Sequence, residues 1–251
     1  MHRFFMPQID FNKPVSIISD PKEIHHAKDV LRLKMNDAVT VFNGLNQEAD
    51  GRIVSITSHK LRVQITRVHK FATSHQKIIL ACAIPKKSKF EFIIEKATEL
   101  GVGEIIPLKT QRTEINLQDE RLLKKNLRYQ TVAANAAKQC QRVHVPWIHP
   151  MMNFKEAVLN LNQRSMVIIP SLIGERTKIL SVFQKLKNPQ TISFLIGPEG
   201  DFTPEEYAYA FENNGIPVSL GETILKVETA ALSVISLCHL WFDANPSESS
   251  P

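Results

Sequence analysis

The sequence has few cysteines and no paired ones. Cys82, Cys140 and Cys238 are the three cysteines in 251 residues, and none belongs to a Cys-x-x-Cys motif. This spacing predicts neither a disulfide framework nor a zinc site, and it fits a reducing compartment. We therefore expect a cytoplasmic protein with no bound metal.

Four further absences narrow the class of protein. Without Gly-x-Gly-x-x-Gly or Gly-x-x-x-x-Gly-Lys-Ser/Thr, the sequence argues against a dinucleotide-binding fingerprint and against a P-loop ATPase. The first residues show no charged-then-apolar signal pattern. The apolar stretch 229–242 is shorter than the roughly 20 residues that a membrane-spanning helix needs. We expect a soluble protein without a membrane partner.

Charge is unevenly distributed along the chain. Residues 1–142 contain 24 Lys and Arg against 14 Asp and Glu, a net charge of +10, whereas residues 143–251 contain 7 against 11, a net charge of −4. Basic side chains neutralise phosphates and give nucleic-acid binding its salt dependence. The first part of the chain therefore favours RNA or DNA as a partner, although a solvated basic face would give the same count.

The pattern of expected elements changes near residue 72. Before it, short strand-like segments dominate (15–18, 39–42, 51–56 and 60–68), with one short helix at 25–33. After it, strand candidates (78–84, 105–108, 167–169, 192–196 and 218–220) alternate with helices, of which 89–100 is the clearest. We predict a small β-barrel domain at 1–72 and an α/β domain with a mostly parallel sheet at 73–251.

Two glycine-containing loops near the C-terminus predict a binding site. The first is Ile196-Gly197-Pro198-Glu199-Gly200-Asp201, and the second runs from Leu220-Gly221 to Glu228-Thr229-Ala230. Each follows a strand-like run and leads into a helix, and Thr203-Pro204-Glu205-Glu206 supplies a capping box for the first helix. Ligands of open α/β sheets favour the crevice beyond the carboxyl ends of strands. Ordinary strand-to-helix turns are the alternative for either loop alone.

In order and spacing, these residues resemble the RsmE family of ribosomal RNA methyltransferases, which belongs to the SPOUT class. The resemblance covers nearly the whole chain. Its marks are the two loops together with Arg3-Phe4-Phe5, His26 with Val30-Leu31-Arg32, Lys86 with Lys89-Phe90-Glu91, residues 95–102, and Gln139-Cys140-Gln141-Arg142.

The resemblance implies a PUA-like RNA-binding barrel followed by an α/β trefoil-knot domain, assembled as a homodimer. It implies S-adenosylmethionine (SAM) as the cofactor and N3 of a uridine in 16S ribosomal RNA of the small ribosomal subunit as the methyl acceptor. On this basis we assign eight residues to the cofactor pocket: Ile196, Gly197, Gly200, Leu220, Gly221, Ile224, Leu225 and Thr229.

Three residues are candidates for the chemistry. Glu228 could orient or deprotonate the base, or cap its own helix, and Lys226 could stabilise negative charge on a uracil carbonyl. Arg142 could bind phosphate or reach the catalytic cleft. The RNA-positioning candidates, each of which could also be a solvated surface charge, are Arg3, Arg32, Lys86, Lys89 and Arg112.

Four positions depart from the family pattern. Asp201 stands where a glycine is common, Thr223 and Lys226 where arginines are common, and Lys138 where a glutamate is usual. Lysine keeps the charge of arginine but not its planar fork. Two alternatives remain: a SPOUT methyltransferase for another RNA position, such as a ribose 2′-hydroxyl, and a non-catalytic RNA-binding ribosome-assembly protein.

Overall fold

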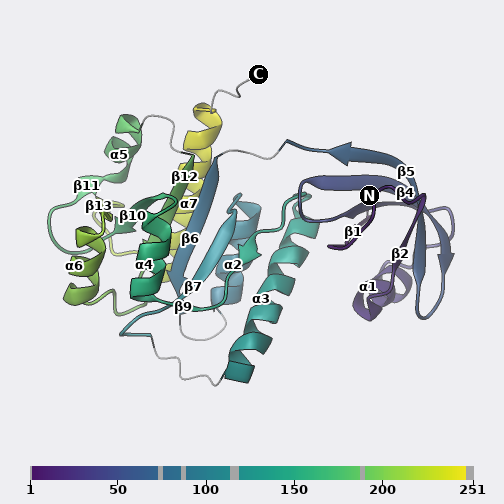
Figure 1. Ribbon diagram of the computed structural model, residues 1–251, viewed down its shortest axis with the longest axis horizontal. Coiled ribbons are helices and arrows are strands. Elements are labelled where there is room, and N and C mark those ends of the chain that lie inside the picture. The colour runs from purple at the N-terminus through teal and green to yellow at the C-terminus, as the bar shows by residue number, and fades with distance from the viewer. Residues whose placement is uncertain (1, 73–75, 86–88, 114–118, 187–189, 247–251) are drawn as a thin grey trace. The chain divides into compact units, whose positions relative to one another are not determined.

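The computed structural model describes the chain except for residues 1, 73–75, 86–88, 114–118, 187–189 and 247–251. Its contacts define two units (Figure 1). The first comprises Met1–Thr73 and Ala137–Val145, and the second Ser74–Ala136 and Pro146–Pro251. The short segment Ala137–Val145 therefore belongs to the first unit. The division expected from the sequence was continuous and placed this segment in the second domain.

The first unit is built on a five-stranded sheet. Its order is β1-β3-β4-β5-β2, in which β1 pairs with β3 in parallel and the other neighbours are antiparallel. The β1 strand was not expected from the sequence, and closure of the sheet into a barrel stays a prediction. The strands are β1 (His2–Phe5), β2 (Val15–Ile18), β3 (Ala38–Phe42), β4 (Gln47–Ile56) and β5 (Leu61–Lys70).

The expected helix at 25–33 is instead a short α-helix, α1 (Pro21–His25), followed by a π-helical turn, η1 (His26–Val30). Asp20 caps the start of α1, because its carboxylate accepts from the backbone N–H of Lys22 at 2.8 Å.

The second unit contains the mostly parallel sheet that the sequence predicts. Its order is β11-β13-β10-β12-β6-β7-β8, with β9 also paired to β7, and every pairing between these strands is parallel. The strands are β6 (Lys77–Ala83), β7 (Glu104–Lys109), β8 (Trp147–Ile148), β9 (Met152–Asn153), β10 (Met166–Pro170), β11 (Thr177–Lys178), β12 (Thr191–Ile196) and β13 (Ile216–Ser219).

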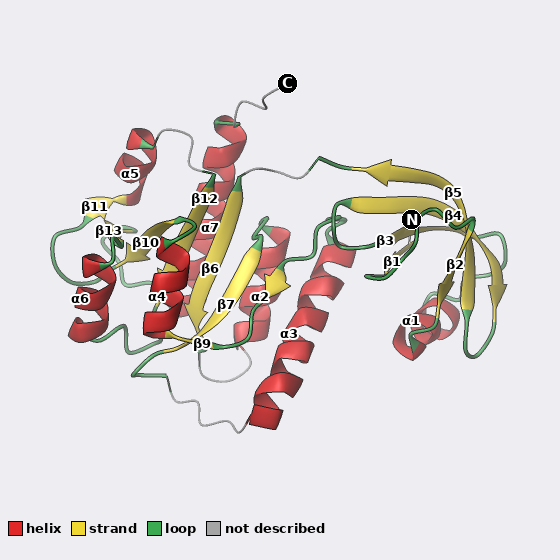
Figure 2. Cartoon of the chain, viewed as in Figure 1, coloured by secondary structure: helices red, strands yellow, loops and turns green. Residues whose placement is uncertain are grey.

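Helices cover both faces of this sheet (Figure 2). On one face α4 packs against β7, β10 and α6, and on the other α7 packs against β6, β12 and α2. Successive side chains of a buried strand point to opposite faces of the sheet, so one strand contributes to the packing on each face. In β6, Ile79 and Ala81 pack on the face covered by α4, and Leu80 and Cys82 point to the opposite face. The helices are α2 (Lys89–Glu99), α3 (Asp119–Gln139), α4 (Phe154–Asn162), α5 (Ile179–Lys185), α6 (Pro204–Glu212) and α7 (Val227–Ala244).

Among the described residues, α7 is the one helix whose length and apolar composition would suffice to cross a membrane. Its packing against β6, β12 and α2 places it instead in the layer that covers the sheet. Val234, Ile235 and Cys238 are fully buried there.

A buried carboxylate connects the start of the central strands. Glu104 of β7 accepts from Nε2 of His149 and pairs with a guanidinium nitrogen of Arg164, both at 2.8 Å, and it also pairs with Lys77 of β6. Burial by itself opposes ionisation, but the hydrogen bonds from His149, Arg164 and Lys77 outweigh it and hold the pKa of Glu104 well below its usual range.

Three neighbouring strands bring separate loops to one edge of the sheet. β13, β10 and β12 are adjacent and parallel, so the segments that follow Pro170, Ile196 and Ser219 emerge at the same edge. The capping box expected at the start of α6 is present: Thr203 Oγ1 accepts from Glu206 N at 3.2 Å, and Thr203 N donates to Glu206 Oε2 at 3.0 Å. This box fixes where the loop after β12 ends.

Candidate active site

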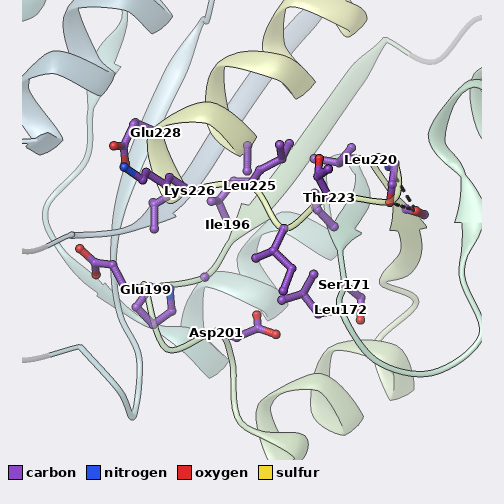
Figure 3. Close-up of a pocket in the computed structure, with 18 of the residues that line it drawn as sticks. Ser171, Leu172, Ile196, Glu199, Asp201, Leu220, Thr223, Leu225, Lys226 and Glu228 are labelled. Atoms are coloured by element: carbon purple, nitrogen blue, oxygen red, sulfur yellow. Dashed lines mark hydrogen bonds between the residues drawn. The ribbon is translucent and has the colours of Figure 1, made fainter.

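A cavity of about 320 Å³ lies at the carboxyl ends of these three strands (Figure 3). Its wall consists of residues 170–172 and Arg176 after β10, residues 196–199 and 201 at the end of β12, and residues 219–221 and 223–228 between β13 and the start of α7. Lys89 and Ala230 complete the lining. The two loops singled out in the sequence therefore meet in one site, as expected for ligand sites of open parallel sheets.

Most of the residues assigned to a cofactor line this cavity. Six of the eight do so: Ile196, Gly197, Leu220, Gly221, Ile224 and Leu225. Gly200 and Thr229 are absent from the lining. Both are exposed, Gly200 in the turn before α6 and Thr229 in the first turn of α7.

Two of the glycines have different physical reasons for lacking a side chain. A Cβ on Gly197 would lie 3.2 Å from the backbone nitrogen of Phe202 and 3.3 Å from a carboxylate oxygen of Asp201, so the loop closes tightly there. Gly221 has open space around it but a φ of +132°, which L side chains rarely adopt. The first glycine is set by packing and the second by backbone conformation.

Lys226 and Glu228 place charged groups on one side of the cavity (Figure 3), and Lys89 also belongs to the lining. Lys89 Nζ donates to Glu228 Oε1 at 3.1 Å. The pKa of Glu228 is lowered, first by a hydrogen bond from its own backbone N–H and then by the nearby ammonium of Lys89. Glu228 is therefore an ionised acceptor at neutral pH. Lys226, the N-cap residue of α7, is exposed.

Arg3 and Arg142 both lie in the first unit and are largely enclosed there. Arg3 forms an ion pair with Glu48 at 2.9 Å and stacks over the Phe42 ring, with its side chain 10 % exposed. Burial lowers the pKa of Arg142 to about 10, so this guanidinium remains charged at neutral pH. The catalytic role predicted for Arg142 and the RNA role predicted for Arg3 stay predictions.

The other RNA-positioning candidates have differing surroundings. Arg32 is exposed and has a left-handed backbone, with φ at 53°. Lys86 lies outside the described residues. Arg112 donates to the carbonyl oxygens of Gly200 and Phe202, so its guanidinium supports the loop after β12. Lys89 belongs to the cavity.

Sequence reasoning missed the loop after β10, which contributes Ser171, Leu172 and Arg176 to the wall. A signal was available: if 167–169 is a strand of the same parallel sheet, the segment that follows it must emerge at the same edge. Asp201 and Thr223, identified in the sequence as departures from a family pattern, also line the cavity.

The lining suits a small nucleoside-like molecule. Leu172, Ile196, Leu220 and Leu225 offer apolar surface for a flat ring, while the loops supply carboxylates, hydroxyls and backbone groups. The volume lies near the lower end of the range of about 300–1,000 Å³ typical of small-molecule pockets. The residues present therefore fit SAM, with its adenosine and its charged amino-acid part.

Two protein-family models match this chain. Residues 72–239 match the RNA methyltransferase domain family, and residues 18–66 match the RNA methyltransferase PUA domain family. The chain is similar to proteins named ribosomal RNA small subunit methyltransferase E. That of Rickettsia conorii is 32 % identical over 91 % of both chains, and that of Bacillus subtilis is 27 % identical over 94 % of this chain and 95 % of the relative.

Solved structures of similar chains contain the cofactor. A ribosomal RNA small subunit methyltransferase E from Neisseria gonorrhoeae, bound to SAM, has a TM-score of 0.83 and 27 % identity, covering 96 % of this chain and 97 % of its own. A methyltransferase of Legionella pneumophila in complex with SAM has a TM-score of 0.84 and 27 % identity, covering 95 % and 96 %.

Proposed function

Since this chain belongs to the ribosomal RNA small subunit methyltransferase E family, we propose that it is a SAM-dependent enzyme that methylates N3 of a uridine in 16S ribosomal RNA. The observation that carries the proposal is the cavity at the ends of β10, β12 and β13, which combines apolar loop walls with a charged side formed by Lys89, Lys226 and Glu228.

The loops hold the cofactor. Ile196, Leu220 and Leu225 provide the apolar surface, while Gly197 permits the tight packing of one loop and Gly221 the positive φ of the other. The proposal keeps Gly200 and Thr229 as cofactor contacts, although both lie outside the cavity lining. When bound, SAM supplies a sulfonium methyl group, which N3 of the uridine accepts as the N3 proton is lost and sulfur keeps the electron pair of the broken bond.

The protein residues orient the base and stabilise its charge. Glu228 is a weak base because its pKa is depressed, so its carboxylate acts mainly as an acceptor that holds the imide N–H in position. The ammonium groups of Lys89 and Lys226 stabilise negative charge on the uracil carbonyls as the proton leaves for solvent. Alignment of the two reactants contributes further, because it makes their encounter effectively intramolecular.

The proposal also includes the RNA, the oligomer and the knot. In this proposal the PUA domain binds the RNA, and the protein is a cytoplasmic homodimer. The α/β unit is knotted at the loop after β13, which passes beside the loops after β10 and β12. Support for dimerisation comes from apolar side chains left exposed on two packed helices, Phe92 of α2 (46 % exposed) and Leu240 of α7 (64 % exposed). Uridine N3 lies on the Watson–Crick edge, so the base must be unpaired or extruded before it reacts.

Transfer of labelled methyl from SAM to small ribosomal subunits lacking uridine N3 methylation tests the proposal, with the product nucleoside identified after digestion. We expect N3-methyluridine, and a drop of about 100-fold in rate for K226M and E228Q. K185M, a charge removed from the exposed end of α5 outside the cavity, controls for a general loss of RNA affinity.

Two outcomes would contradict the proposal. A ribose-methylated product would assign the chain to another RNA position. SAM binding with no transfer to any ribosomal RNA substrate would favour a binding protein that retains the fold.

A further inference from the structure

Asp201 is an unusual residue at the cavity wall. Its φ of 62° lies in the left-handed region, which favours glycine and which Asp and Asn tolerate better than most other residues. It follows Gly200 and precedes the capping box of α6. Asp201 therefore places a carboxylate beside the cavity from a left-handed backbone position.

One oxygen of this carboxylate is committed to the loop. Oδ1 accepts from the backbone N–H of Phe202 at 2.8 Å and from the hydroxyl of Tyr207 at 2.7 Å. Tyr207 is 1 % exposed and its pKa is raised, first by burial and then by Asp201, so it remains a donor. These two contacts fix the orientation of the carboxylate before any ligand arrives.

The second oxygen, Oδ2, has no hydrogen-bond partner among the described residues, whereas a carboxylate oxygen can accept two hydrogen bonds. The neighbouring hydroxyls are already used within their own turns. Ser171 Oγ donates to Ile173 O and accepts from Ile173 N, and Ser219 Oγ does the same with Gly221. Oδ2 is therefore a pre-oriented anionic acceptor at this end of the cavity.

The position of Asp201 selects the part of the ligand that it meets. Figure 3 shows Asp201 near Ser171 and Leu172, away from Lys226 and Glu228. On the proposed function, the reacting methyl lies beside Lys226 and Glu228, which leaves the nucleoside part at the Asp201 end. Carboxylates in nucleotide sites commonly accept hydrogen bonds from ribose hydroxyls.

We infer that Asp201 is an additional cofactor-binding residue of this chain, whose Oδ2 accepts a hydrogen bond from a ribose hydroxyl of SAM. The inference rests on the proposed function. Because Oδ1 is held by Phe202 and Tyr207, little ordering of the side chain is needed on binding, and the contact favours ligands with an intact ribose.

Calorimetric titration measures this contact without catalysis. The ligands are S-adenosylhomocysteine, 5′-methylthioadenosine, which lacks the amino-acid part, and the 2′-deoxy and 3′-deoxy analogues of 5′-methylthioadenosine. D201G removes the acceptor and keeps the left-handed backbone accessible. We expect D201G to weaken both ribose-containing ligands about 10-fold, the effect of one hydrogen bond to a charged group. Removal of the recognised ribose hydroxyl should lower the affinity of wild type by the same factor of about 10 and should leave the affinity of D201G almost unchanged.

D201N is the second variant, because Asn tolerates the backbone and its oxygen can still accept from Phe202 and Tyr207. It presents an amide donor to the cavity, so the hydroxyl contribution should shrink there too. E205Q, an exposed carboxylate change outside the cavity, should bind every ligand as wild type does.

The inference is overturned if wild type and D201G lose equal affinity when either hydroxyl is removed. It is also overturned if D201G weakens S-adenosylhomocysteine but not 5′-methylthioadenosine, since the carboxylate would then recognise the amino-acid ammonium. A wild-type chain that binds neither SAM nor S-adenosylhomocysteine overturns the proposed function together with this inference.

Discussion

Reversal of one charge in the first unit should destabilise it strongly. Lys138 lies in the last turn of α3, and its Nζ lies 2.6 Å from Glu23 Oε1. The two side chains are 18 % and 13 % exposed. K138E would place two carboxylates together in a largely enclosed position, and would add a negative charge at a helix C-terminus, where the macrodipole disfavours it.

The size of the effect follows from the geometry. Two unit charges about 4 Å apart in an effective dielectric of about 20 interact with about 4 kcal/mol. Breaking a buried pair by removing one partner typically costs about 3–5 kcal/mol. Since part of each side chain reaches solvent and can turn toward it, we expect K138E to cost about 3 kcal/mol. In a unit of this size that would lower the melting temperature by roughly 15 °C.

A charge-swap cycle separates this pair from other effects. Unfolding of K138E, E23K and the double variant would be followed by calorimetry, with hydrogen exchange of peptides from α1 and η1 reporting on the first unit. The double variant should recover at least 2 kcal/mol relative to K138E. K96E, which reverses a charge in a solvent-accessible cluster on α2, should destabilise the protein much less than K138E does. If K138E destabilises the protein no more than K96E does, or if the double variant recovers no stability, the ion pair between Lys138 and Glu23 does not stabilise the first unit.

Three further predictions concern the cavity, the sheet and the RNA surface. G221A should weaken SAM about 10-fold in calorimetry, because the φ of +132° at this position resists a Cβ and the loop would have to change conformation. Because the pKa of Glu104 is lower in the folded than in the unfolded protein, its ionised carboxylate stabilises the fold above the unfolded pKa of about 4.3, and this contribution is lost as the pH falls toward the folded pKa. The difference in urea midpoint between wild type and E104Q should therefore narrow below about pH 4. If exposed Arg32 contacts an RNA phosphate, R32Q should reduce the salt slope of ribosomal RNA binding by about 0.7–0.9; an unchanged slope would make Arg32 a solvated charge.

The parallel sheet and its helices could be predicted from the sequence because their signals are local. The buried run of β12 keeps its predicted end at Ile196, and Thr203 with Glu206 specifies the start of α6 through a capping box of four residues. The β1 strand was missed because His2–Phe5 is too short for a periodic signal, and its partner β3 is more than 30 residues away.

The parts of the cofactor site that lie in glycine-containing loops could be predicted from the sequence. The part that depends on the order of strands in the sheet could not. The loops after β12 and β13 carry Gly197 and Gly221, whereas the loop after β10 contributes to the wall only because β10 lies between those two strands. Strand order depends on pairings between distant residues, which no local pattern encodes.

The departures from the family pattern show that the sequence also could not reveal the partners of unusual charged residues. Lys138 was noted in the sequence as an unusual charge, but its partner Glu23 is 115 residues away, so its effect on stability could be inferred only from the fold. Asp201 was noted as a missing glycine, and its partners Phe202 and Tyr207 are one and six residues away. Even so, the sequence could not indicate that one carboxylate oxygen remains available to the cavity. A substitution can thus be recognised as unusual from the sequence, whereas its sign and magnitude depend on which groups the fold brings within a few ångströms of it.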